Sequence, residues 1–155
     1  MAQFKDLKSL ETYLTQAVGE IASNSMELED TMAETMRQAV YDIVYDAYSP
    51  TQYERRADKG GLSDVDNMVI TSADMRNGKV LLSFENITSG VDTLEGKRLD
   101  DTINDGIAGN WANPNGSWSE PRRFIEETRE RLQQKSGELT RELEKELKRA
   151  GFKTR

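Results

Sequence analysis

The sequence predicts an α+β protein, with long N-terminal helices, a twisted antiparallel β-hairpin or small sheet, and a long C-terminal helix. Apolar residues recur at three- and four-residue spacing near both ends of the chain, which is the period of an amphipathic helix. Asn77-Gly78 lies between two strand-like segments and is the strongest short signal for a hairpin turn. The length of 155 residues favours a single domain. Its expected parts are an N-terminal helical extension (1–25), a helix and sheet body (26–118) and a C-terminal helix (119–155).

Two helices are expected before the sheet. The first, over residues 3–22, is indicated by an apolar stripe of Phe4, Leu7, Leu14, Val18 and Ile21. Asn24, with Glu27 three residues later, predicts the N-terminal cap of the second helix. The second helix should end at Ser49-Pro50, because the residue before a proline disfavours helical backbone. Its stripe consists of Leu28, Met32, Met36, Val40, Ile43, Val44 and Ala47.

The hairpin follows a loop over residues 57–66. A two-residue turn pairs Arg76 with Lys79 and, counting back, Thr71 with Phe84. A lone hairpin is marginally stable, so we expect it to pack on the long helix or to join strands of a neighbouring copy. This register predicts one apolar face, formed by Val69, Ala73, Met75, Val80, Leu82 and Phe84.

Two more helices are expected after the hairpin. The first is short and is marked by Leu99, Ile103 and Ile107. The last runs from Ser119 or Glu120 to Ala150, with Pro121 in its first turn and Gly151 as its left-handed stop. Gly137 is expected to kink or break this helix.

The charge is unevenly distributed along the chain. The net charge is −7, but residues 1–118 carry 10 Lys/Arg against 20 Asp/Glu, and residues 119–155 carry 11 against 8. Ordinary solvated helix faces explain this distribution. The alternative is a head-to-tail contact between the acidic body of one copy and the basic end of the next. The net acidity argues against nucleic-acid binding, so no sequence-specific nucleic-acid partner is expected.

The composition argues against most enzyme chemistry. The chain contains no Cys and no His, which excludes thiolate chemistry and His-based catalytic triads. No stretch approaches the roughly 20 apolar residues that span a bilayer, so no membrane contact is expected. The closest acidic pairs, Asp64/Asp66 and Asp100/Asp101, lie in polar segments. We therefore expect no enzyme activity, no bound metal and no cofactor.

Two arginine doublets are the most distinctive polar features. Arg55-Arg56 follows the long helix, and Arg122-Arg123 precedes the last one. They are either solvated pairs or guanidinium forks that bind acidic groups across a subunit interface. The tryptophans in the polar loop before the last helix pack locally or anchor a partner. Together with a narrow leucine stripe that suits a partner helix, the candidate interface residues are Tyr53, Arg55, Arg56, Trp111, Trp118, Pro121, Arg122, Arg123, Phe124, Leu139, Leu143 and Leu147.

The order of these elements carries a family resemblance. A helix leads into Tyr48-Ser49-Pro50-Thr51-Gln52-Tyr53-Glu54-Arg55-Arg56, and Gly61-Leu62 then leads into the hairpin. Pro121-Arg122-Arg123-Phe124 opens the C-terminal helix. In this order, over roughly residues 28–152, the chain resembles the small tail-completion or neck proteins of long-tailed phages of Gram-positive bacteria, which are similar to the minor tail component of lambda-like phages.

This resemblance implies a structural role. Such a subunit forms a ring, expected to be hexameric, which joins or completes the tail at the head–tail interface. Its partners would be other copies of the chain and the connector, tail terminator or tail tube. It would reside in the virion, and in the host cytoplasm during assembly. The family segment after the long helix is matched by Tyr53, Glu54, Arg55 and Arg56. The start of the final helix is matched by Pro121, Arg122 and Phe124, and Arg123 stands where many relatives have another proline.

Two other functions compete with the ring. A cytosolic helical adaptor would bind a partner through residues 138–150 and remain a monomer. A hydrolase would use Asp64 and Asp66 with Mg²⁺, and metal would then stabilise it against heat.

Overall fold

The structure is a computed structural model, and it describes residues 4–47, 49, 54–90, 96–106 and 120–154. It has the α+β fold that the sequence predicts. The helices are α1 (Leu7–Ser23), α2 (Met26–Ala39), α3 (Leu99–Asp105), α4 (Phe124–Gln134) and α5 (Ser136–Arg149). Two strands, β1 (Met68–Arg76) and β2 (Lys79–Asn86), form the hairpin. A π-helical turn, η1 (Val40–Tyr45), and a 3₁₀ turn, η2 (Val65–Asn67), complete the elements.

The first two helices are separated by a short break. α1 begins after Asp6, whose side chain accepts a hydrogen bond from the Ser9 amide at 2.7 Å in a capping box, so the helix starts later than predicted. Asn24 closes α1 by donating to the Glu20 carbonyl. The predicted cap at Asn24 is wrong, because the Ser25 hydroxyl caps α2 at the Leu28 amide.

The second helix changes its winding near its end. After Ala39 the chain continues as the π-helical turn η1, where the Asp46 amide donates to the Tyr41 carbonyl five residues earlier. Helical structure ends at Tyr45, before the predicted Ser49. The wider turn keeps Val40 and Val44 in the core.

The hairpin contains a β-bulge that shifts the predicted register. The pairs from Arg76–Lys79 to Ala73–Leu82 are as predicted. Thr71 is then skipped, so Phe84 pairs with Ile70 instead of Thr71. An extra residue reverses which side chains of a strand point to a given face. Met68 and Ile70 therefore take the apolar face, and Val69 shares the opposite face with Glu85.

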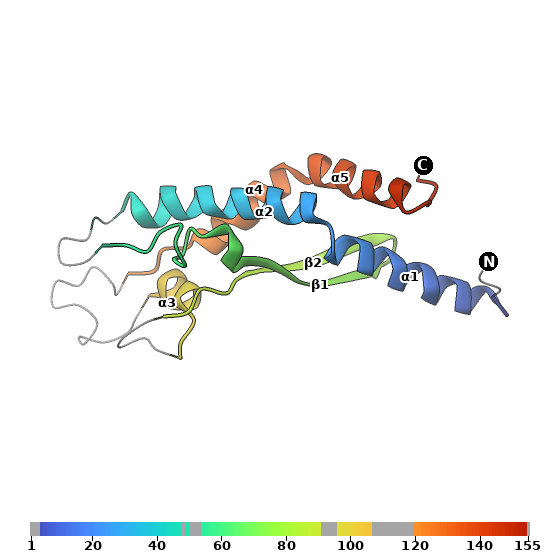
Figure 1. Cartoon of the computed structure of the whole chain (residues 1–155), viewed down its shortest axis with the longest axis horizontal. Coiled ribbons are helices and arrows are strands. Elements are labelled where there is room, and N and C mark those ends of the chain that lie inside the picture. The colour runs from blue at the N-terminus through green and yellow to red at the C-terminus, as the bar shows by residue number, and fades with distance from the viewer. Residues whose placement is uncertain (1–3, 48, 50–53, 91–95, 107–119, 155) are drawn as a thin grey trace.

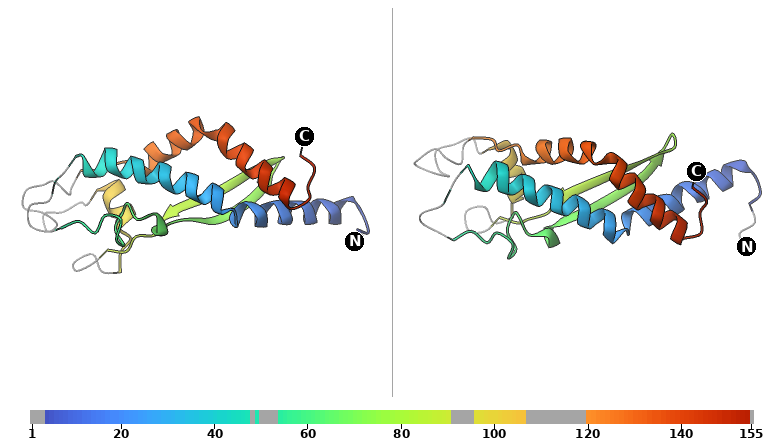
Figure 2. Two further views of the ribbon diagram at one scale, coloured as in Figure 1. Left: turned by 45° about the horizontal axis from the view of Figure 1, so that its top comes forward. Right: turned by 90° about the horizontal axis from the view of Figure 1, so that it is seen from above.

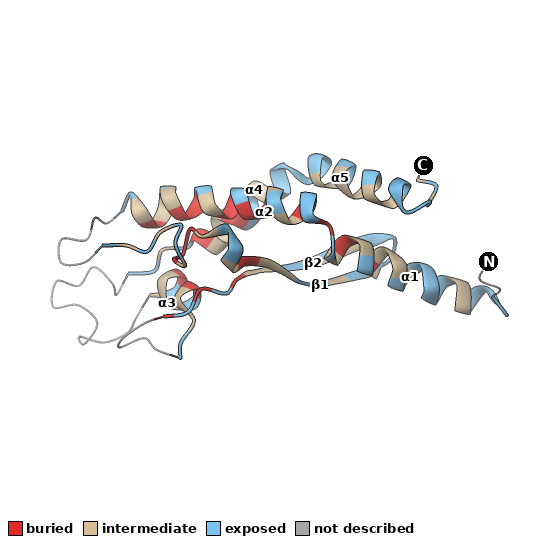
Figure 3. Cartoon of the chain, in the orientation of Figure 1, coloured by how far each residue is buried: buried red, intermediate tan, exposed pale blue. Residues whose placement is uncertain are grey.

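The hairpin packs on helices of its own chain. α1 lies along β1 so closely that a Cβ added to Gly19 would stand 2.9 Å from the Ala73 carbonyl oxygen. α2 and α4 lie side by side near the base of the hairpin (Figures 1 and 2). The core lies between them and gathers Ala33, Met36, Ala39, Val40, Val44, Leu62, Met68 and Phe124. Further buried residues lie toward the end of α1 and in α3 (Figure 3).

The C-terminal part is two helices rather than one. α4 begins at Phe124, so Pro121 precedes the helix instead of occupying its first turn. The helix breaks at Lys135 (φ −89°, ψ 8°), two residues before the predicted Gly137. Gly151, with φ +89°, ends α5 as predicted. The short helix α3 is also confirmed, and it ends at Gly106.

The molecule is elongated, and its two ends differ. Both termini lie at one end, together with the outer part of α1 and the end of α5 (Figure 1). At the other end lie α3, residues 46–47 after η1, residues 54–56, and residues 120–123, which lead into α4.

Candidate functional site

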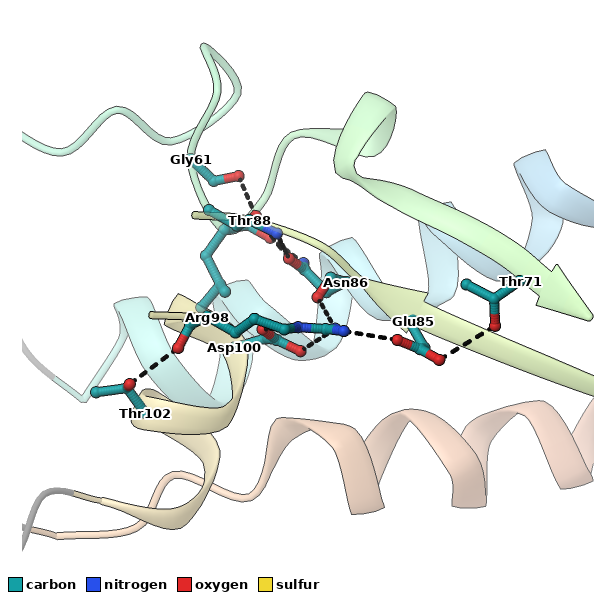
Figure 4. A network of polar contacts seen from close by, with 9 residues as sticks. Gly61, Thr71, Glu85, Asn86, Thr88, Arg98, Asp100 and Thr102 are labelled. Carbon is teal, nitrogen blue, oxygen red and sulfur yellow. Dashed lines mark hydrogen bonds and ion pairs between the residues drawn. The ribbon is translucent and has the colours of Figure 1, made fainter. Parts of the chain in front are cut away.

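A polar network joins the end of the hairpin to α3 (Figure 4). Arg98 contacts Asp100 through Nε at 3.0 Å and Nη2 at 2.7 Å. It also contacts the Glu85 carboxylate at 2.7 Å and the Asn86 carbonyl at 2.5 Å. These two carboxylates raise the pKa of the Arg98 guanidinium, with Asp100 as the larger cause. Hydrogen bonds from Arg98 and then Thr71 lower the pKa of the Glu85 carboxyl. Arg98 thereby acts as a fixed cation.

The same strand end holds the loop before the hairpin. The Asn86 side chain donates to the Leu62 carbonyl at 2.8 Å, and the Thr88 hydroxyl contacts the Gly61 carbonyl at 3.1 Å. Both side chains are fully buried. The segment Gly61-Leu62, which contributes to the family resemblance, therefore has a structural role: hydrogen bonds hold it to the end of the hairpin.

The first arginine doublet binds groups of its own chain. The Arg55 guanidinium lies over the Tyr45 ring, 4.5 Å from its centroid, in a cation–π contact. Burial is the main reason why the pKa of the Tyr45 hydroxyl is raised. Arg56 donates to the Ser89 carbonyl at 2.7 Å. Both arginines thus connect the segment after η1 to other parts of the same chain, and Arg56 remains exposed.

The second doublet precedes a helix that a distant side chain caps. The Arg122 amide donates to the Ile103 carbonyl of α3 at 3.0 Å, and Arg123 forms an ion pair with Glu126. The buried Asn104 side chain accepts from the Ile125 amide at 3.1 Å, which caps α4 from another helix.

Phe124 corrects the sequence interpretation. It is fully buried in the core of the single chain, so its ring offers no surface to a partner.

Two carboxylates from the closest acidic pairs of the sequence have structural roles. Asp64 accepts from the Gly60 and Asp66 amides, which positions it as the cap of η2. Asp100 is held by Arg98. Within the described residues, no group of three or more Asp, Glu, His or Cys side chains is placed to hold a metal ion.

The predicted interface residues fall into two groups. Arg55, Arg56, Arg122 and Arg123 belong to segments that α3 and its neighbouring strand end bring to one end of the molecule. The half-buried leucine stripe lies on α5, toward the other end (Figures 1 and 3). Pro121 is exposed beside the second doublet. Tyr53, Trp111 and Trp118 lie outside the described residues.

α4, Lys135 and α5 contact α2 and η1 through a row of polar side chains. Along α2 and η1, Arg131 pairs with Asp42 at 2.8 Å, and the Lys135 ammonium contacts the Thr35 hydroxyl at 3.1 Å. Further along, Glu142 accepts from Thr31, and Arg149 pairs with Glu27. α4 and α5 therefore run antiparallel to α2.

The sequence interpretation did not identify the surface at the outer end of α1. There Leu7 is 84% exposed, and Phe4, Tyr13 and Leu14 are also exposed. The centroids of the Phe4 and Tyr13 rings lie 5.0 Å apart. We call Phe4, Leu7, Tyr13 and Leu14 the α1 patch. The sequence shows the periodic spacing of Phe4, Leu7 and Leu14, but this spacing alone does not tell which turns of the helix another element covers.

Comparison with known proteins places this geometry in a family. The model of the YomN family matches residues 6–149, which include every helix and strand described above. The chain belongs to the YomN family. It is 30% identical to the SPbeta prophage-derived uncharacterized protein YomN of Bacillus subtilis (strain 168), over 97% of this chain and 98% of the relative.

This relationship connects the chain to bacteriophages. The relative is prophage-derived by name, so the chain is a phage-associated protein. Neither the family nor the relative is described as a neck or tail protein, and that finer assignment is taken up below as a proposal. No solved structure matches the chain. Among the described residues, no helix is long and apolar enough to cross a membrane.

Proposed function

We propose that this YomN-family chain is a structural protein of the phage particle, and that it forms a ring that joins or completes the tail at the head–tail interface. The observation that carries the proposal is the α1 patch. Apolar side chains exposed on a helix at the edge of a subunit suit burial against another subunit. The prophage relative and the resemblance of the Tyr48–Arg56 and Pro121–Phe124 segments to neck proteins add support.

The shape of the subunit supports a head-to-tail contact. The α1 patch and the arginine doublets lie at opposite ends of an elongated chain, and a contact between different ends generates a ring when the rotation closes. A ring of this kind needs no catalytic group, because its function is geometric. We expect six copies and partners among the connector, tail terminator and tail tube.

The helical adaptor remains the second candidate. It would bind a partner through the leucine stripe of α5. That stripe is half-buried, and α5 packs on α1 and α2 of its own chain, so α5 would have to separate from them to bind a partner.

Light scattering after size exclusion, over a range of concentrations, tests the ring. The wild-type chain should show a discrete ring mass or should close into rings as its concentration rises. Leu7→Glu should lower the assembled fraction at least tenfold, because it places a charge in the α1 patch. Gln16→Glu adds the same charge at an exposed polar position of α1 and should assemble normally. A wild-type monomer at all concentrations would favour the adaptor.

A further inference from the structure

The two C-terminal helices differ in how firmly the chain holds them. α4 buries Phe124 and Thr128 in the core, and Asn104 caps its first turn. α5 has no buried residue along its 14 positions. The boundary between the firmly held helix and the loosely held one is the break at Lys135.

The contacts that α5 makes are of a kind that contributes little. Arg149 and Glu27 are 62% and 45% exposed at the side chain, so their ion pair is weak. The hydrogen bond between Thr31 and Glu142, at 3.1 Å, fixes the direction of α5 along α2. The half-buried leucines provide the remaining contact. Together these interactions specify where α5 lies without binding it tightly.

The break at Lys135 leaves helical hydrogen bonds in place on both of its sides. The Lys135 amide still donates to the Arg131 carbonyl at 3.1 Å, and the Leu139 amide donates to the Lys135 carbonyl at 3.0 Å. The dihedral angles at Lys135 lie outside the α-helical region. Nothing lies within 4 Å of the position where Gly137 would carry a Cβ, so no neighbouring atom obstructs a change there.

The sequence is also compatible with a straight helix. Leu132 and Leu139 are seven residues apart, so the apolar stripe of α4 continues into that of α5 in helical register. If Lys135 became helical, α4 and α5 would form one helix. The leucine stripe of α5 would then leave its own α2 and project from the subunit.

We propose that α5 is exchanged between copies, so that the surface formed by α1 and α2 is a docking site for α5 of a second copy. The occupant is specified by the contacts already described. A second copy provides the same carboxylate for Thr31, the same guanidinium for Glu27 and the same leucines. Exchange of an identical element keeps every one of these contacts and connects subunits at low cost.

This inference rests on the proposed homo-oligomer, and it adds a second contact between copies to the one at the α1 patch. It also assigns the break at Lys135 a role as the hinge between a monomer with α5 packed on its own α2 and a ring in which α4 and α5 form one straight helix.

Because the native chain has no cysteine, single thiols can test the exchange without background. Thr31→Cys and Glu142→Cys are prepared separately, with tags of different mass, and are mixed and concentrated with a short bismaleimide. Exchange predicts a covalent species that contains one copy of each. Arg141→Cys, at the neighbouring exposed position of α5, is the matched control and should give less than a tenth of that product.

A locked variant gives an independent test. The double variant Thr31→Cys/Glu142→Cys, cross-linked at high dilution, holds α5 on its own chain. If exchange builds the ring, the locked protein should remain monomeric at concentrations where the untreated double variant assembles.

The outcomes separate this inference from the proposed function. Rings that form without any cross-link between copies, or that form from the locked variant, would overturn the exchange and leave the ring proposal intact. A monomer at every concentration, with no cross-link between copies, would overturn both.

Discussion

Arg98 binds Asp100 through two of its nitrogens, and the Asp100 side chain is only 3% exposed whereas that of Arg98 is 39% exposed. The cation thus covers a buried carboxylate from the solvent side. The two residues are also the last position before α3 and its second residue, so their contact fixes the direction in which α3 leaves the hairpin.

Removing this cation should destabilise the fold. Arg98→Leu leaves the buried Asp100 carboxylate without its main partner, and the free energy of unfolding should fall by about 2 kcal/mol. Urea denaturation followed by circular dichroism measures the change. Arg76→Leu is the control, because its ion pair with Asp74 is exposed on both sides and should contribute about 0.5 kcal/mol or less. Equal effects of the two changes would contradict a special role for Arg98.

The same network should make stability sensitive to acid. The pKa of Glu85 in the folded chain lies below its ordinary value of 4.5, mainly because of the hydrogen bond from Arg98. The ionised form is therefore favoured by folding. Its contribution is fully present above about pH 4.5 and is lost as the pH falls through the lower, folded-state value.

Glu85→Gln should flatten the loss of stability in this acidic range. Thermal unfolding measured between pH 6 and pH 3 should show a smaller decrease in Tm for the variant than for the wild-type chain. Glu130→Gln, on the exposed face of α4, serves as the control and should keep the wild-type slope. A variant slope equal to that of wild type would show that Glu85 contributes nothing to acid sensitivity.

Two glycines in helices should respond to alanine in opposite directions. Gly19→Ala places a Cβ 2.9 Å from the Ala73 carbonyl oxygen, so α1 must move away from β1 and Tm should fall. Gly137→Ala meets no atom within 4 Å and should gain up to about 1 kcal/mol from its higher helix propensity. Calorimetry of both variants checks the pair. A rise in Tm for Gly19→Ala would mean that α1 does not lie so close to the hairpin.

The cap that Asn104 provides to α4 should be measurable. Asn104→Ala leaves the Ile125 amide without its side-chain acceptor and should cost about 1–2 kcal/mol, the usual range for loss of a helix cap. Asp101→Ala, at an exposed position of α3, is the control for effects on α3 alone. Hydrogen exchange at the Ile125 amide should accelerate in the first variant and stay unchanged in the second.

Sequence patterns predicted those features that depend on neighbouring residues. The hairpin turn at Asn77-Gly78, the helix α3 and the stop at Gly151 all follow from local chemistry. Features set by distant contacts were missed. The bulge at Thr71 is one of them, since the Ile70 amide beside it donates to Glu29 of α2, 41 residues away. No local pattern indicates such a partner.

The candidate site shows the same division. The sequence shows the arginine doublets as unusual pairs, but it does not show their partners. Arg55 contacts a tyrosine ring, Arg56 a backbone carbonyl and Arg123 a carboxylate, and only the fold brings these groups together. Phe124 belongs to the Pro121–Phe124 motif that the sequence analysis described, but its role is in the core and not at a surface. The exposure of Leu7 was not predicted, because residue spacing does not tell which turns of α1 another element covers.

The position of both termini at one end of the molecule has a practical consequence for imaging. A density label fused to either terminus would mark the same pole of each subunit. If the chain forms the proposed ring, labels at the N-terminus and at the C-terminus should therefore appear on the same face of the ring in electron micrographs. Their offset from the centre of the subunit would show which end of the subunit forms that face.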